Sequence, residues 1–402
     1  MTNAVDPFAI LLNAIALYTR SIVRIATAKV GMKSKLNSAI DFFYLLVFRS
    51  SYWGLFSFLL LISILQNGVW YAPNAPFFLE IAENIYINPF LSNPNAQWQL
   101  FSFLGPTIAF LIGANQSLLL FSLMHVVFFL VFFVLFAYYL RLQFPESVAR
   151  SVLVVFFLTP LPSILLTWVG SPDVFTVLLS TTMILFRKKP VVIFFSAVLM
   201  GINHFEQGTA ILVLTSIFLL LTEGKATLPY VVSYLLGISL GRMILETHFS
   251  SYSFDVTFGR FSYFSEYGIS LFIENNLRNP VVLVYSLFQM LGGFLFIYVM
   301  LNWRGGNSAP AFVLCCAGAF GLILFTLDQT RVFSTLIFPI LLLFLLSSDH
   351  QPLADSAKLM LNKALAASFA LGVLVPRIIV WESSLFASAY LFIVGYFSGA
   401  IR

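Results

Sequence analysis

Charged residues are unusually scarce in this sequence. Only 9% of the 402 residues are Asp, Glu, Lys or Arg, whereas 60% are hydrophobic and the mean hydropathy is +0.96. A water-exposed globular surface cannot be assembled from so few charges. Apolar runs of roughly 20 residues, the length that a helix needs to cross a bilayer, follow one another almost from end to end. The sequence therefore predicts an all-α integral membrane protein.

The sequence has only two cysteines and no nucleotide-binding motif. Cys315 and Cys316 are the only cysteines, and they are adjacent within an apolar run. They cannot readily form a structural disulfide, and they carry no signal about the redox compartment. Neither G-x-x-x-x-G-K-[ST] nor a strand followed by G-x-G-x-x-G is present. We therefore expect no nucleotide-binding domain and no cofactor.

Basic residues outnumber acidic ones, and their placement predicts a topology. A net charge of +5 is compatible with nucleic-acid binding. The Lys and Arg, however, fall in short clusters between apolar runs, which is typical of cytoplasmic loops, so we expect no nucleic-acid partner. Most of the 16 acids fall at the predicted outer face, and all but five of the 21 Lys and Arg fall inside. The five exceptions are Arg242, Arg260, Arg278, Arg331 and Arg377.

The topology divides the chain into two parts. Residues 1–50 are predicted to form a cytoplasmic amphipathic segment, and residues 51–402 a single transmembrane domain with outer loops at 71–115 and 249–280. The stretch 100–114 is about half a bilayer long and is predicted to be a re-entrant or juxtamembrane helix, because this choice keeps the basic clusters inside. We expect both termini to be cytoplasmic, in a bacterial inner membrane. About twelve spans are predicted: 53–70, 117–140, 149–168, 173–186, 190–203, 209–222, 227–247, 281–302, 309–327, 333–348, 362–380 and 384–400.

Polar clusters interrupt the apolar runs at the predicted outer ends of the spans. A charge near membrane depth is costly, so such residues usually pair or line an aqueous cavity. Asp173, in GSPD, is either a general base or an acid that caps a helix start. Glu80 and Glu83, three apart in the first outer loop, are either general bases for an acceptor hydroxyl or solvated residues of a loop helix. Arg260, in the second outer loop, is a candidate substrate-binding residue.

Two further clusters, NHFEQG and DQTR, carry other candidate substrate-binding residues. His204, Glu206 and Gln207 lie in a break between two short apolar segments. There the imidazole and the carboxylate hold a proton, a hydroxyl or a metal, or else cap helix ends. Their spacing is not that of a known metal motif. Asp328 and Arg331 are three apart at the start of a span. The guanidinium of Arg331 suits a phosphate, and an ion pair between the two residues is the structural alternative.

The architecture resembles the polytopic glycosyltransferases of the GT-C superfamily. The matching features are a long outer loop with acids and a half-length helix after the first span, an aspartate at the outer start of a span (SPDVFTVLL), and an acid-plus-arginine cluster (DQTRVF). In that superfamily the catalytic carboxylate commonly stands close behind the first span. This chain has Tyr71 to Asn74 there, and the nearest acids are Glu80 and Glu83.

The resemblance implies sugar transfer at the non-cytoplasmic face. The donor would be a polyprenyl-phosphate-linked sugar, the acceptor a lipid or cell-envelope glycan, and no metal is expected. Arg331, with His204, would hold the donor phosphate, while Glu80, Glu83 or Asp173 deprotonates the acceptor. Two other classes stay open: an O-antigen-type polymerase or ligase, and a transporter or flippase. A transporter predicts ionisable residues near mid-membrane and on both sides, whereas most of these lie at one end of the helices.

Overall fold

The computed structural model describes most of the chain. Three predicted features lie outside the described residues: the N-terminal segment up to residue 31, Arg260 with most of the outer loop 249–280, and all but the start of the last predicted span. The described residues are 32–256, 274, 280–289, 291–303, 306–326, 328–348, 355–375, 377–381 and 384–387.

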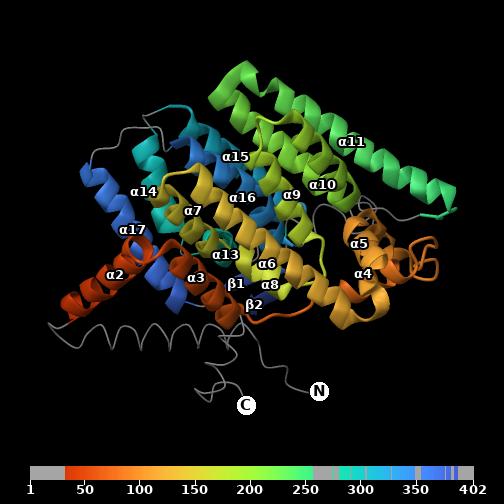
Figure 1. Cartoon of the computed structure of the whole chain (residues 1–402), viewed down its shortest axis with the longest axis horizontal. Helices are drawn as coiled ribbons and strands as arrows, with labels where there is room; N and C mark the ends of the chain where they lie inside the picture. The colour runs from red at the N-terminus through yellow and green to blue at the C-terminus, as the bar shows by residue number, and fades with distance from the viewer. Residues whose placement is uncertain are drawn as a thin grey trace, which may run out of the picture.

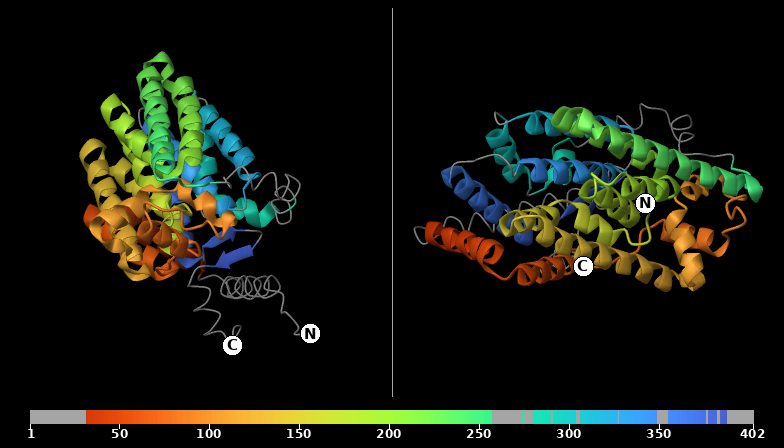
Figure 2. Two further views of the ribbon diagram at one scale, coloured as in Figure 1. Left: turned by 90° about the vertical axis from the view of Figure 1, so that its right-hand side faces the viewer. Right: turned by 45° about the horizontal axis from the view of Figure 1, so that its top comes forward.

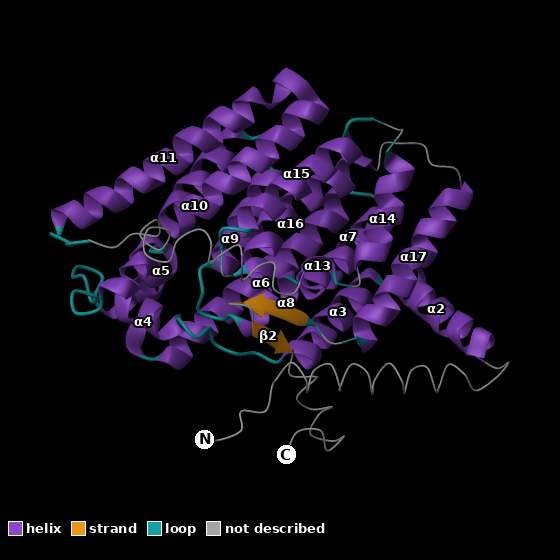
Figure 3. Ribbon diagram, turned by 180° about the vertical axis from the view of Figure 1, so that it is seen from behind, coloured by secondary structure: helices purple, strands orange, loops and turns teal. Residues whose placement is uncertain are grey.

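The described residues are almost entirely helical, which confirms the all-α prediction (Figures 1 and 2). A small antiparallel sheet of β1 (Ile378–Trp381) and β2 (Ser384–Ala387), drawn in orange in Figure 3, lies at the edge of the helical bundle. The α-helices are α2 (Met32–Arg49), α3 (Tyr52–Asn67), α4 (Ala75–Glu83), α5 (Leu104–Ile112), α6 (Leu118–Gln143), α7 (Glu146–Leu158), α8 (Leu161–Thr167), α9 (Asp173–Leu185), α10 (Pro190–Glu223), α11 (Leu228–Ser251), α13 (Pro280–Phe288), α14 (Leu291–Asn302), α15 (Ser308–Ile323), α16 (Gln329–Ser348) and α17 (Asp355–Leu374). Three short 3₁₀ helices are η1 (Pro94–Phe101), η2 (Ala114–Gln116) and η3 (Gly224–Thr227).

Helix α16 runs through the middle of the bundle. In its most apolar window 89% of the residues are buried, against 33% for α6 and 39% for α17. The outward residues of α6 include large apolar side chains such as Leu119, Val127 and Leu135, all exposed. An apolar outer face of this kind suits contact with lipid. Arg331, near the start of α16, is therefore enclosed by protein.

The number of membrane-spanning helices differs from the prediction of about twelve. By length and composition, four described helical stretches can cross a membrane: Leu118–Gln143, Pro190–Ser251, Gln329–Ser347 and Ala357–Leu374. The pair of α7 and α8, bent by 55°, makes a fifth if it is counted as one span. The chain thus has several long apolar helices, as a multi-pass membrane protein does, but not twelve spans in the described residues.

Breaks within apolar runs account for the difference. The predicted span 149–168 is interrupted between α7 and α8, and 281–302 divides between α13 and α14. The predicted span 362–380 ends as a helix at Leu374 and continues into β1, while 384–400 begins as β2. Helices α3, α9, α14 and α15 are apolar but only 10–17 residues long. A full crossing needs roughly 20 residues, so apolar composition alone overestimates the count.

Helix α10 is a hairpin. Its backbone is not helical at His204, where φ is −163° and ψ is 81°. Arg187, just before α10, forms an ion pair with Glu223 at its end, with 3.1 Å between Nε and Oε1. A straight helix would separate its two ends by about 50 Å. A Cβ at Gly208 would also lie 2.6 Å from Cγ of Met200, two turns earlier in the chain. The break predicted between 190–203 and 209–222 is therefore confirmed.

Glycines allow α11 to pack unusually close to the first half of this hairpin. Gly237 and Gly241 form a G-x-x-x-G pair on α11. A Cβ at Gly241 would lie 2.1 Å from the carbonyl oxygen of Val198, and one at Gly237 would lie 2.4 Å from that of Phe194. Helices in membranes commonly associate through small residues in this way, because dispersion contacts increase as the backbones approach.

Replacing Gly241 by leucine is expected to lower the free energy of unfolding by about 1–3 kcal/mol, the usual cost of overpacking. The added side chain would meet the backbone of Val198, which cannot move without shifting the hairpin. A lower thermal unfolding midpoint in detergent would report this. Gly293→Leu is the matched control, since a Cβ at Gly293 in α14 meets nothing within 4 Å. Equal midpoints for the two variants would contradict the proposed packing role.

The predicted half-length helix at 100–114 is present as α5. With nine residues it is about 14 Å long, roughly half the hydrocarbon thickness of a bilayer. Just before it, the Phe103 N–H donates to the carbonyl oxygen of Ile202 at 3.1 Å, at the reversal of α10. Helices α4 and α5 lie together beside the reversal of α10 and the C-terminal end of α11 (Figure 1).

Basic residues gather at the end of the bundle opposite Asp173. Asp173 begins α9, and Arg187 follows the end of that helix. The Tyr139 hydroxyl donates to the carbonyl oxygen of Leu185 at 2.9 Å, so the end of α6, which carries Arg141, lies there too. We call this the basic end. At the other end, the site end, α9 and α16 begin and the α10 hairpin reverses.

Arg377 forms hydrogen bonds with the end of α7, at the break between α7 and α8. Its guanidinium donates to the carbonyl oxygens of Phe157 and Leu158, each at 2.8 Å, and to Gln289 Oε1 at 2.7 Å. The same group lies 5.0 Å from the centre of the Phe157 ring. A cation is favourable at a helix C-terminus, where carbonyls lack helical partners. Arg377 is buried, and its hydrogen bonds fix the bend from which α8 leads to Asp173.

Candidate functional site

The loop that carries Asp173 is tied to the loop after α3. Trp70 N–H donates to the carbonyl oxygen of Leu166, and Val169 N–H donates to that of Trp70. Gly170 has a φ of +92°, which favours glycine, and a Cβ there would lie 2.7 Å from Cβ of Ala75. These backbone contacts hold the turn that begins α9.

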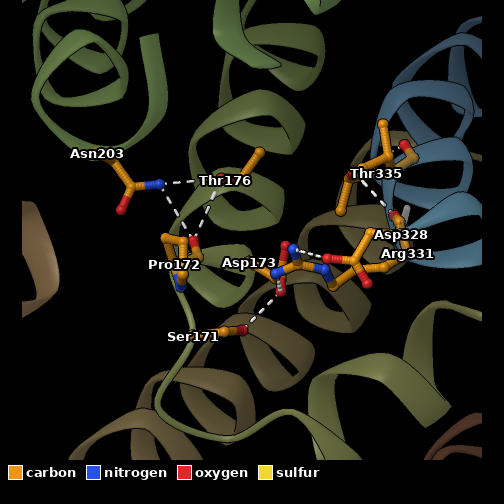
Figure 4. Close-up of polar contacts among 9 residues, drawn as sticks. Ser171, Pro172, Asp173, Thr176, Asn203, Asp328, Arg331 and Thr335 are labelled. Atoms are coloured by element: carbon orange, nitrogen blue, oxygen red, sulfur yellow. Dashed lines mark hydrogen bonds and ion pairs between the residues drawn. The ribbon is translucent and has the colours of Figure 1, made fainter. Parts of the chain in front are cut away.

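Asp173 and Arg331 meet at the site end, as Figure 4 shows. Arg331 Nη1 donates to Asp173 Oδ2 at 3.2 Å, and Ser171 Oγ donates to the same oxygen at 2.6 Å. Arg331 Nη2 donates to Asp328 Oδ2. The guanidinium also lies 5.1 Å from the centre of the Trp168 ring. We call Asp173, Asp328 and Arg331 the charged cluster.

Several polar atoms of the charged cluster have no hydrogen-bond partner although they are buried. These atoms are Asp173 Oδ1, Asp328 Oδ1 and Arg331 Nε. The side chain of Asp173 is 1% exposed, that of Arg331 10% and that of Asp328 16%. Leaving a buried polar group without a partner costs roughly 1–3 kcal/mol, and more for a charged one. The cluster thus offers two carboxylate oxygens and one N–H for which the described residues supply no partner.

Two carboxylates share one guanidinium in this cluster, so its formal charge is −1. Burial raises the pKa of the Asp328 carboxyl above its ordinary value, an effect that Arg331 opposes and Asp173 reinforces. Asp173 is the acid in the first turn of α9, as predicted, while the N-cap residue, Pro172, makes no side-chain capping hydrogen bond. The predicted Asp328–Arg331 ion pair is present, but a third residue, Asp173, shares it.

The tip of the α10 hairpin lies beside this cluster. Asn203 Nδ2 donates to the carbonyl oxygen of Pro172 at 3.1 Å and to Thr176 Oγ1 at 2.9 Å (Figure 4). His204 Nδ1 lies 3.6 Å from Glu206 Oε2. The Gln207 N–H donates to the same nitrogen at 3.4 Å. His204 and Glu206 thus contact each other within the tip, while Asn203 joins the tip to α9.

Glu80 and Glu83 lie outside the charged cluster. Both are on α4, where Glu80 is half-buried and Glu83 is exposed. In the described part of the chain neither side chain makes a polar contact with Asp173, Asp328 or Arg331. Of the predicted site residues, the structure thus brings together those of GSPD and DQTR, with NHFEQG next to them. Arg260 lies outside the described residues.

Sequence reasoning missed three residues that contact this site: Ser171, Trp168 and Asn203. Ser171 stands two residues before Asp173, a spacing at which a hydroxyl can reach the carboxylate, so a local signal existed. Asn203 ends an apolar helix half, and its partners lie 27 and 31 residues away in the chain. No local pattern marks such a contact. Among the described residues no group of three or more His, Cys, Asp or Glu could share a metal ion.

Comparisons with known proteins give no family for this chain. No family model matches it, and neither the curated proteins nor the solved structures contain a significant match. The functional argument therefore depends on the geometry of the site itself.

Proposed function

We propose that the protein is a membrane glycosyltransferase that moves a sugar from a polyprenyl-phosphate donor to a hydroxyl of a lipid or cell-envelope glycan. The observation that supports this most is the placement of Asp173. Its Oδ2 is held by Ser171 and Arg331, while its Oδ1 is without a partner. A carboxylate oriented through one oxygen and available through the other suits a general base.

In the proposed reaction the acceptor oxygen bonds to the anomeric carbon of the sugar. The bond from that carbon to the phosphate oxygen breaks, and its electron pair leaves with the polyprenyl phosphate. The acceptor proton passes to Asp173 Oδ1. Arg331 Nε, the unpartnered N–H of the cluster, is placed to donate to the leaving phosphate, whose negative charge grows during the reaction. One displacement at the anomeric carbon inverts its configuration.

Access to these atoms requires movement, because they are enclosed by protein. The loop before α9 contacts the cluster through Ser171 and Trp168. Of the three carboxylates predicted as bases, Asp173 has the neighbours that this role needs, and Glu80 and Glu83 do not. No step in the scheme uses a metal.

The orientation in the membrane is part of the same proposal. Cytoplasmic loops are enriched in Lys and Arg, so we assign the basic end to the cytoplasm and the site end to the outer face. The membrane would be a bacterial inner membrane, with both termini cytoplasmic. A donor that carries its sugar on a lipid would reach the charged cluster laterally, between helices.

Purified full-length protein tests the proposal directly. The protein in detergent is incubated with labelled polyprenyl-phosphate hexoses and lipid-linked sugar acceptors, and the products are separated by chromatography. The same protein in liposomes is assayed for movement of these lipids between leaflets. We expect transfer of label to the acceptor without such movement. Movement without any consumption of donor would overturn the transferase assignment.

A transporter or flippase is the second candidate, because two helical segments are broken near the charged cluster. Helix α10 reverses at His204, and α7 and α8 are bent by 55°. In many transporters discontinuous helices form the substrate site. The charged cluster, however, lies where helices begin, at one end of the bundle. The liposome assay above distinguishes the two functions.

A further inference from the structure

The side-chain amide of Asn203 uses its nitrogen for hydrogen bonds, whereas its oxygen has no partner. The residue is fully buried, and its Nδ2 donates to the carbonyl oxygen of Pro172 and to Thr176 Oγ1. A carbonyl oxygen can only accept, so the amide group cannot be turned around without losing this bond. Oδ1 therefore points away from these two partners (Figure 4), and it is buried without a hydrogen-bond partner.

Other buried acceptors without partners belong to residues of the α10 tip, of the start of α9 and of the charged cluster. Besides Asn203 Oδ1, they include Gln207 Oε1, which lies just beyond the reversal of α10, and Asp173 Oδ1, on the residue after Pro172. Asp328 Oδ1 adds a further one in the charged cluster. A ligand that satisfies several acceptors must bring several O–H or N–H donors. A sugar is dense in hydroxyl donors, whereas a phosphate or a lipid tail brings none.

We infer that Asn203 binds a sugar hydroxyl, with Oδ1 as the acceptor, and so contributes to the choice of sugar. This inference rests on the proposed function. Asn203 acts through a direct contact and takes no part in proton transfer. The hydrogen bond to Pro172 connects the Asn203 amide to the residue just before Asp173. The group that binds the sugar hydroxyl and the proposed general base are therefore positioned by the same turn of the chain.

A buried water molecule is the competing explanation. Internal waters commonly satisfy buried polar groups and make about three hydrogen bonds each. A water would satisfy Asn203 Oδ1 whatever sugar is present. The two explanations therefore differ in whether the effect of removing Asn203 depends on one particular hydroxyl of the ligand.

The test couples a side-chain deletion to a hydroxyl deletion. Dissociation constants are measured for the full-length protein with polyprenyl-phosphate hexoses and with their monodeoxy analogues. A second arm uses monodeoxy sugars in a lipid-linked acceptor, because the recognised hydroxyl can belong to either substrate. With the unaltered protein, we expect one deoxy analogue to bind about tenfold more weakly than its parent. With Asn203→Ala, parent and that analogue should bind equally, and the other analogues should be affected as the parent is.

Asn302→Ala is the matched control. Asn302 is also fully buried, with Nδ2 donating to the carbonyl oxygen of Tyr298 and Oδ1 without a partner. Asn302 is the last residue of α14, and Asn307, a few residues later, donates through Nδ2 to the carbonyl oxygen of Leu221 at the basic end. The control residue therefore lies away from the site end. This variant should keep the tenfold discrimination. If Asn203→Ala does not fold, Thr176→Val is used instead. That variant removes one of the two partners that fix the amide, and it should weaken the same discrimination by a few-fold.

The outcomes separate the inference from the function on which it rests. If the unaltered protein binds parent sugars and the Asn203 variant weakens all analogues alike, a structural role or a bound water is correct and the inference is wrong. If the unaltered protein binds none of the sugar lipids, the proposed function fails and the inference fails with it. If the Asn203 variant loses the contribution of one particular hydroxyl and the control variant keeps it, both the inference and the proposed function are supported.

Discussion

Asp173→Asn is expected to lower the rate of sugar transfer by about 10²–10⁴-fold, the usual contribution of a general base. Asparagine has the same shape, and its amide oxygen can accept from Ser171 and Arg331 as Asp173 Oδ2 does. It cannot take up a proton. Arg331 keeps Asp328 as its anionic partner, so the variant should remain folded. Initial rates at saturating donor, together with KM, measure the effect.

The control variants are Glu80→Gln and Glu83→Gln. Both residues lie on α4 without polar contact to the charged cluster in the described part of the chain, so each variant should keep nearly the full rate. A large loss for Glu80→Gln with little loss for Asp173→Asn would place the base on α4. In that case the first outer loop, and not the start of α9, would supply the base.

Arg331→Met is expected to lower the free energy of unfolding by about 3–5 kcal/mol, the cost of leaving buried charges without their partner. Asp173 and Asp328 would then face each other without the cation that lies between them. Protonation relieves this repulsion. The destabilisation should therefore be largest at neutral pH and become smaller as pH falls through the raised pKa of the Asp328 carboxyl. Thermal unfolding midpoints between about pH 4 and pH 8 measure this dependence.

A triple variant separates charge from packing. Asp173→Asn, Asp328→Asn and Arg331→Met together remove every charge of the cluster, and replacing a whole buried ion pair is often nearly neutral. We expect this variant to regain most of the stability that Arg331→Met loses, with a flat pH dependence. It should have no measurable transferase activity. A triple variant as unstable as the single one would mean that the arginine acts mainly through packing against Trp168.

Composition and charge placement predicted the general character of the protein. Few charges and long apolar runs were enough for an all-α bundle with apolar outer helices. The polar break in NHFEQG predicted the reversal of α10, because polar residues between two short apolar segments mark a place where a helix stops. The basic clusters correctly identified residues that share one end, since Arg141 and Arg187 are brought together by α6 and α9.

The number of spans could not be obtained in the same way. Hydropathy does not indicate where a helix ends when the end lies within an apolar run. The bend at Pro160 and the change from α17 to β1 near Arg377 depend on contacts made by distant residues. The pairing of Asp173 with Arg331 links positions 158 residues apart. The local sequence pattern identified each residue as a candidate, but no pattern in the sequence between them predicts that the two side chains are in contact.

The bond between Arg377 and the end of α7 has a consequence for the order of assembly. The carbonyl oxygens of Phe157 and Leu158 receive donors from a residue about 220 positions later in the chain. During synthesis, α7 and α8 enter the membrane long before that donor exists. The hydrogen bonds that Arg377 makes at their bend can form only after the C-terminal region has been synthesised. Synthesis of that region therefore completes the support of the bend that leads to Asp173, although no residue of the charged cluster lies beyond Arg331.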